Sequence, residues 1–156
     1  MEEKQKSSIR VINLSGYEVP TVKEERNKEW MNYGSNNDYF DNIIERYLGS
    51  PTNSRCINGI TDMIFGRGLD ALDSLDKPKE YLEMKKLLPK RHVKKVCSDY
   101  KLLGQAAIQL TYAKGKKKIL KVGHFPMECL RAEKASSKGV IQAYYYHPSW
   151  KDIKTS

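Results

Sequence analysis

The fold class is decided by residues 93–122, VKKVCSDYKLLGQAAIQLTYAKGKKKILKV, because the hydrophobic period changes within them. Before Gly104 the apolar residues recur at the three- and four-residue spacing of an amphipathic helix, which predicts a helix over 91–103 with a basic outer face. After Gly104 the period is two, as in a strand with one buried face that holds Ala106, Ile108, Leu110 and Tyr112. The sequence therefore predicts a switch from helix to sheet at this glycine.

A turn and further strands follow this switch. Lys114-Gly115-Lys116 is a turn signal, and Lys117 to Val122 is predicted to return as the second strand of a hairpin. Two more short strands are predicted at 127–132 and 140–146, separated by a turn at Ser136-Ser137-Lys138-Gly139.

Two helices are predicted upstream, over 38–48 and 51–65. Ser50 suits an N-cap and Pro51 suits the first helical position, so a sharp turn is expected between the helices. We expect the two helices to pack together as a helical corner through Ile43, Ile44, Tyr47, Ile57, Ile60 and Ile64. Pro78 opens a further helical pattern that ends at Leu88.

The whole chain is thus predicted to be α+β, with N-terminal helices followed by a small antiparallel sheet. Residues 1–8 have few apolar side chains and are expected to be disordered, whereas residues 9–156 are expected to form a single α+β region. Tyr144 to Trp150 is the most aromatic stretch of the chain, and we expect it to need a partner, either another chain or the continuation of a longer protein.

Charge is distributed unevenly along the 156 residues, which carry a net charge of +9. Residues 1–80 contain 11 Lys+Arg and 14 Asp+Glu, net −3, and residues 81–156 contain 17 and 5, net +12. Such asymmetry indicates either a surface that meets an anionic partner or an ordinary solubilising face. Without an apolar run that could cross a membrane or a secretory signal, and with three cysteines in no CxxC spacing, the chain is expected in the cytoplasm.

The sequence contains no recognisable catalytic or cofactor motif, and the chain is predicted to be no enzyme and to hold no metal or cofactor. His92 and Cys97 have the same spacing as His124 and Cys129, but this spacing matches no zinc knuckle, and Cys97 is more simply a small buried hydrophobe. Gly66-Arg67-Gly68 lacks the continuation of a phosphate-binding loop.

The lysines of the basic helix and of the hairpin are the candidate contacts to phosphate or to a partner chain. They are Lys94, Lys95, Lys101, Lys114, Lys116, Lys117, Lys118 and Lys121. One function class is accordingly a basic α+β module that binds nucleic acid or a partner protein. Tyr144, Tyr145 and Tyr146 have no adjacent Lys or Arg, so the interleaved pattern typical of single-strand binding is missing.

Three groups of motifs, in the same order along the chain, resemble one known family. The first comprises EWMNYGSNNDYF (29–40), IIERY (43–47), SPT (50–52), CING (56–59) and IFGRGL (64–69). The second comprises HFPME (124–128) and LRAEK (130–134), and the third runs from AYYY (143–146) to Trp150. Together they resemble the N-terminal region of tailed-bacteriophage portal proteins, especially those of phages and prophages of Bacteroidetes.

The resemblance implies a subunit of a homo-oligomeric ring, usually a dodecamer, at one vertex of the capsid. DNA is packaged and ejected through such a ring, and terminase and head–tail connector proteins dock on it. It also implies weak, non-specific contact with double-stranded DNA, no membrane, no catalytic residue and no cofactor. The implied location is the virion, with assembly in the host cytoplasm. A complete portal subunit is several hundred residues long, so this chain would correspond to the beginning of the outer wing region.

Overall fold

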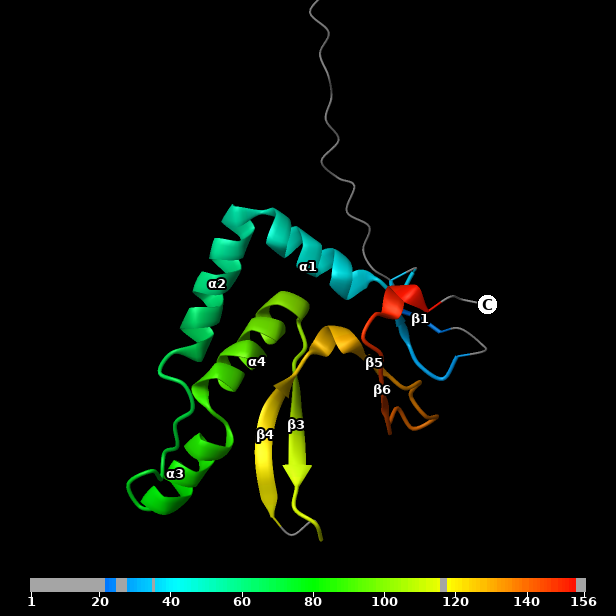
Figure 1. Cartoon of the computed structure of the whole chain (residues 1–156). Helices are drawn as coiled ribbons and strands as arrows, with labels where there is room; N and C mark the ends of the chain where they lie inside the picture. The colour runs from blue at the N-terminus through cyan, green and yellow to red at the C-terminus, as the bar shows by residue number, and fades with distance from the viewer. Residues whose placement is uncertain (1–21, 25–27, 35, 116–117, 154–156) are drawn as a thin grey trace, which may run out of the picture.

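The computed structural model describes residues 22–24, 28–34, 36–115 and 118–153. Four helices come first: α1 (Tyr39–Gly49), α2 (Pro51–Phe65), α3 (Pro78–Leu87) and α4 (Lys90–Leu103). In chain order these helices follow two short strands, β1 (Val22–Lys23) and β2 (Asn32–Tyr33), and precede all the other strands. The hairpin β3 (Ala107–Tyr112) and β4 (Ile119–Phe125) follows, and then β5 (Leu130–Ala132) and β6 (Tyr144–Tyr146) (Figure 1). The predicted α+β class is confirmed, while the expectation for residues 1–8 lies outside the described residues.

Local signals set the helix boundaries where the sequence placed them. The Ser50 hydroxyl accepts a hydrogen bond from the Asn53 amide at 3.3 Å, and Pro51 occupies the first turn of α2. α2 ends where Gly66 takes a positive φ of 50°, and α4 ends at Gly104 in the left-handed region, with φ of 73°. Gly104 therefore stops the helix and lets the chain turn into β3.

The strands form three separate two-stranded antiparallel sheets, β1–β2, β3–β4 and β5–β6, rather than the one small sheet expected. Leu110 lies opposite Val122 in the hairpin, and the register shifts between Thr111 and Tyr112. α4 and α3 lie along β4 (Figure 1), where the His124 amide donates a hydrogen bond to Nδ1 of His92 on α4 at 3.3 Å. β3 is the outer strand, and no further strand pairs with it among the described residues.

The prediction that α1 and α2 pack through their apolar stripes is wrong in its details. Ile43 and Ile44 pack instead against the buried core of Phe40, Leu103 and Met127. α2 lies along α4, and Ile64 near its end is half-exposed. The corner itself is held by polar groups: the Tyr47 hydroxyl donates to Oδ1 of Asn58 at 2.8 Å, and the Ser54 hydroxyl donates to the Tyr47 carbonyl. The amphipathic pattern shows which side of a helix is apolar, but not which element covers it.

A fully buried arginine joins the helical and strand parts of the molecule. Arg131 on β5 donates from Nε to Oδ1 of Asn37 at 2.6 Å and from Nη2 to the Asn37 carbonyl at 2.9 Å. Its Nη1 reaches the carbonyls of Glu128 and Leu130 at 2.9 and 2.8 Å. Asn37 has a φ of 58°, a left-handed conformation that asparagine tolerates better than most residues. Burial lowers the pKa of Arg131 to about 10, and the side chain remains a cation at neutral pH.

Aromatic rings surround this guanidinium. The ring centroids of Tyr33, Phe40 and Trp150 lie 5.3, 5.1 and 5.1 Å from Cζ of Arg131, within the range of cation–π attraction. The expectation that the whole Tyr144 to Trp150 stretch needs a partner is wrong for Trp150, which is buried and donates from Nε1 to the Cys129 carbonyl at 2.9 Å. Tyr144 and Tyr146 are exposed.

Candidate interaction surfaces

The structure does not gather the eight predicted lysines into one surface. Lys94 faces α2, where its Nζ lies 2.6 Å from Oδ1 of Asp62 and forms an ion pair. Lys95 is exposed on α4, and Lys101 is partly buried further along the same helix. Lys114, Lys118 and Lys121 are exposed on the hairpin, and Lys116 and Lys117 lie outside the described residues.

A smaller basic cluster forms where the start of α4 meets β4, and we define it as Arg91, His92, Lys95 and Lys121. The His92 ring lies beside Gly123 of β4, where a Cβ would be 3.7 Å from Cε1 of His92, an ordinary contact distance. Burial lowers the pKa of His92, and the positive charges of Arg91, Lys121 and Lys95 lower it further. From the sequence, His92 is considered only as a zinc ligand and Arg91 is not among the candidate basic residues, although Arg91 stands four residues before Lys95 on the same helix.

We expect the free energy of unfolding to depend on pH through His92 of the basic cluster. The folded-state pKa of His92 lies below its ordinary value of 6.5, so the unfolded chain binds this proton more readily. The free energy of unfolding should therefore fall as the pH drops through 6.5 towards the folded-state pKa, and protonation would also remove the Nδ1 acceptor used by the His124 amide.

We expect His92→Asn, whose amide oxygen can replace Nδ1 as acceptor, to weaken this dependence. The measurement is the urea midpoint of parent and variant at about pH 5.5 and about pH 7.5, on either side of an ordinary histidine pKa. An equal pH dependence in the two proteins would exclude His92 as its source.

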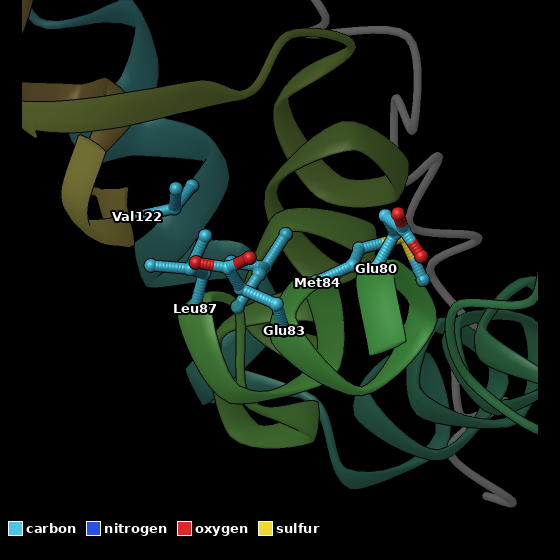
Figure 2. A pocket seen from close by; sticks show the side chains of 6 residues that line it. Glu80, Glu83, Met84, Leu87 and Val122 are labelled. Carbon is cyan, nitrogen blue, oxygen red and sulfur yellow. The ribbon is translucent and has the colours of Figure 1, made fainter. Parts of the chain in front are cut away.

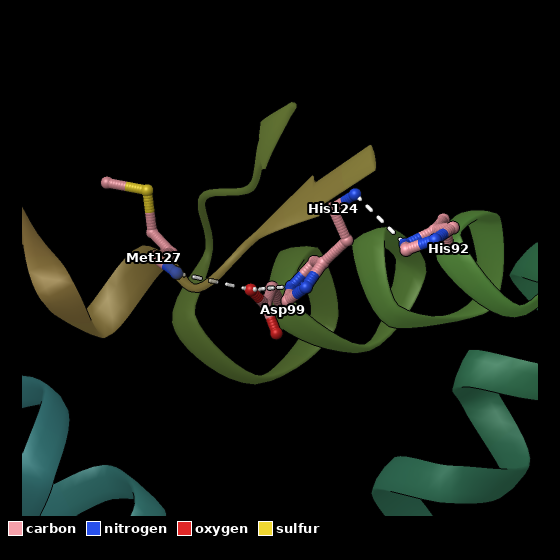
Figure 3. Close-up of polar contacts among 4 residues, drawn as sticks. All are labelled: His92, Asp99, His124 and Met127. Carbon is pink, nitrogen blue, oxygen red and sulfur yellow. Dashed lines mark hydrogen bonds and ion pairs between the residues drawn. The ribbon is translucent and has the colours of Figure 1, made fainter. Parts of the chain in front are cut away.

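His124 and Asp99 form a second polar contact on the same side of β4. Nε2 of His124 lies 2.7 Å from Oδ2 of Asp99, which also accepts the Met127 amide at 3.4 Å (Figure 3). This contact ties α4 to the end of β4 and to the following 3₁₀ turn, Met127–Cys129. In the described part of the chain, no group of three or more His, Cys, Asp or Glu residues could hold a metal ion.

One apolar cavity of about 320 Å³ lies between α3 and β4. Figure 2 shows the side chains around it, which are Glu80, Glu83, Met84, Leu87, Leu88 and Val122. The two glutamates are exposed, and no histidine, cysteine or hydroxyl group lines the cavity. The residues that line the cavity therefore offer apolar contact and negative charge. They do not include a serine, threonine or cysteine nucleophile next to a histidine base.

The largest departure from expectation is the apolar face of the hairpin. Ile108, Leu110 and Tyr112 alternate along β3 as predicted, yet they are 49%, 46% and 48% exposed. Leu120 beside them on β4 is also exposed. The prediction of a strand with one buried face is thus wrong for the chain alone, because α3 and α4 reach β4 and stop short of covering β3.

Comparison with known proteins finds no matching family model, no matching curated protein and no matching solved structure. Among the helices of the described residues, none has both the length and the apolar character that a membrane span requires.

Proposed function

We propose that this chain is a structural assembly subunit without catalytic activity, whose outer strand β3 is covered by another copy of the chain. The observation that supports the proposal best is the half-exposed apolar face of a two-stranded hairpin. Two strands alone are only marginally stable in water, and apolar faces of this kind usually have a partner.

The portal resemblance gives this proposal its specific form. We propose a subunit of the wing region of a phage portal ring at the capsid vertex, the conduit for DNA packaging and ejection, on which capsid, terminase and connector proteins dock. A ring needs heterologous contacts, in which one side of a subunit meets a different side of its neighbour. The half-exposed apolar face of β3 would be one of these two contact surfaces.

The size of the exposed face limits how tightly the chain alone can associate. Burying a half-exposed residue such as Leu110 contributes about 1 kcal/mol, so the few residues of the apolar face and the partner side chains that cover them contribute on the order of 8 kcal/mol together. Association costs at least about 4 kcal/mol in lost freedom of motion. We therefore expect mostly monomer at micromolar concentration and association in the range of about 0.1–1 mM.

A nucleic-acid-binding module is the alternative, and the basic cluster favours it. Arg91, Lys95 and Lys121 lie close enough together to lower the pKa of His92, and such a group can contact consecutive phosphates. With three or four cationic contacts, binding to DNA would be independent of sequence and steeply weakened by salt.

Sedimentation velocity over about 5 µM to about 0.5 mM, with and without a labelled DNA duplex, distinguishes the two functions. The assembly proposal predicts that the average mass rises with concentration without DNA, and that DNA binding is lost at physiological salt. A chain that stays monomeric and binds the duplex at submicromolar concentration in physiological salt would contradict it. Lys95→Ala combined with Lys121→Ala should then abolish that binding.

A further inference from the structure

The connection between α2 and α3 contains an exposed repeat. Residues 69–76 are LDALDSLD, in which Leu-Asp recurs every three residues, and we call them the acidic leucine segment. Leu72 and Leu75 are 109% and 93% exposed, the highest values among the exposed large hydrophobic residues of the described chain. A loop that only connects two helices through solvent needs its polar residues, but it does not need two leucines exposed to water.

The acidic leucine segment is held in shape by its own hydrogen bonds. Oδ1 of Asp70 accepts the Ala71 amide at 2.9 Å and the Tyr81 hydroxyl at 3.0 Å. The amides of Ser74 and Asp76 donate to the carbonyls three residues before them, each at 3.1 Å. Asp73 pairs with Lys77 on the next turn at 3.0 Å. Leu72 and Leu75 are therefore presented on ordered turns rather than on a loose loop.

The hairpin has the complementary chemistry. Its apolar face presents Ile108, Leu110 and Tyr112 at half exposure. From Tyr100 to Met127 the sequence contains six lysines and no Asp or Glu. A partner for this face should therefore be apolar and acidic, which describes the acidic leucine segment of the same chain.

The two surfaces are separate patches on different elements of the fold. In Figure 1 the acidic leucine segment joins the lower end of α2 to α3 on the left, and β3 lies to the right of β4. α3 and α4 contact β4, and Leu110 lies on the same face of the hairpin as Val122, one strand further from these helices. Two different, complementary surfaces on one chain generate a head-to-tail contact between copies, which closes into a ring if the rotation between copies permits.

We propose that the acidic leucine segment of one copy docks on the apolar face of β3 in the next copy, with Leu72 and Leu75 covering Ile108 and Leu110. Asp73 and Asp76 would then meet the lysines at the end of the hairpin, among them Lys114 and Lys118. This inference rests on the proposed assembly function and names the two surfaces of its contact.

The test uses two variants of the full chain that each lose one surface. The first is Leu72→Ser with Leu75→Ser, and the second is Ile108→Thr with Leu110→Thr. All four positions are exposed, and threonine suits a strand, so both variants should keep the parent melting temperature to within a few degrees. Leu82→Ser, at an exposed position of α3 outside the acidic leucine segment, is the matched control.

Sedimentation velocity at about 0.5 mM should show that each double variant associates at least about tenfold more weakly than the parent, whereas Leu82→Ser associates like the parent. An equimolar mixture of the two double variants should recover association and stop at the heterodimer. In this mixture the intact acidic leucine segment of one variant meets the intact β3 face of the other, and no second contact is possible.

Three results would overturn the proposal, and they separate its failure from that of the proposed function. A Leu72→Ser, Leu75→Ser protein that associates like the parent would reject this contact and leave assembly through another surface. Two variants that each fail to associate and do not complement one another would reject the head-to-tail pairing. A parent that remains monomeric at about 0.5 mM would reject the proposed function together with the inference.

Discussion

Replacement of Arg131 by alanine is expected to lower the free energy of unfolding by about 3–5 kcal/mol, a large part of the roughly 5–15 kcal/mol of an ordinary domain. The side chain is fully buried, and its loss would leave the Asn37 carbonyl without its donor and Oδ1 of Asn37 with only the Tyr33 amide. The carbonyls of Glu128 and Leu130 would also lose the donor Nη1. A cavity would remain between the rings of Phe40 and Trp150, adding the cost of lost packing.

Arg131→Lys is expected to rescue little of this stability. A lysine has one terminal nitrogen and cannot replace the three guanidinium nitrogens that donate to Asn37, Glu128 and Leu130. Its ammonium also does not stack on aromatic rings as a planar guanidinium does. Chemical denaturation of both variants checks the expectation, with Arg67→Ala at an exposed position as the control. An Arg131→Ala protein whose stability lies within about 1 kcal/mol of the parent would show that the guanidinium is not the centre of this core.

Replacement of Trp150 by alanine is expected to cost about 3–5 kcal/mol. The indole is buried against Trp30 and His147, with ring centroids 5.5 and 5.8 Å away, and its Nε1 hydrogen bond reaches across to Cys129. Removal of the indole would also take away one of the aromatic rings that pack on the Arg131 guanidinium and would expose it to water.

Tyr146→Ala is the matched control for Trp150→Ala, because Tyr146 belongs to the same aromatic stretch but is exposed. We expect this variant to change the thermal midpoint by only a few degrees. Equal losses of stability in the two variants would contradict the assignment of Trp150 to the core and of Tyr146 to the surface.

The sequence was most informative where the structure depends on neighbouring residues. Ser50, Pro51 and Gly104 act within one or two turns of their own position, and they placed the bounds of α2 and the end of α4 closely. The alternation at Ile108, Leu110 and Tyr112 likewise placed β3. Such signals do not depend on what the rest of the chain does.

The sequence was least informative where residues distant in the chain meet. Arg131 lies in the polar run LRAEK and pairs with Asn37, 94 residues away, so no periodicity could predict its burial. The same holds for the covering of Ile43 and Ile44 by Leu103 and Met127. Of the candidate lysines that the structure describes, only Lys95 and Lys121 come together around His92, because the placement of β4 against α4 decides which of them meet.

The central claim is that another copy of the chain covers the face of β3. Hydrogen exchange of the backbone amides, compared at about 10 µM and about 0.5 mM, tests it most directly because it locates the residues that association protects. The account predicts slower exchange at the higher concentration in residues 107–112 and 69–76, with no change in α2 over 51–65. Exchange that is the same at both concentrations throughout the chain, or that slows only outside these two segments, would contradict it.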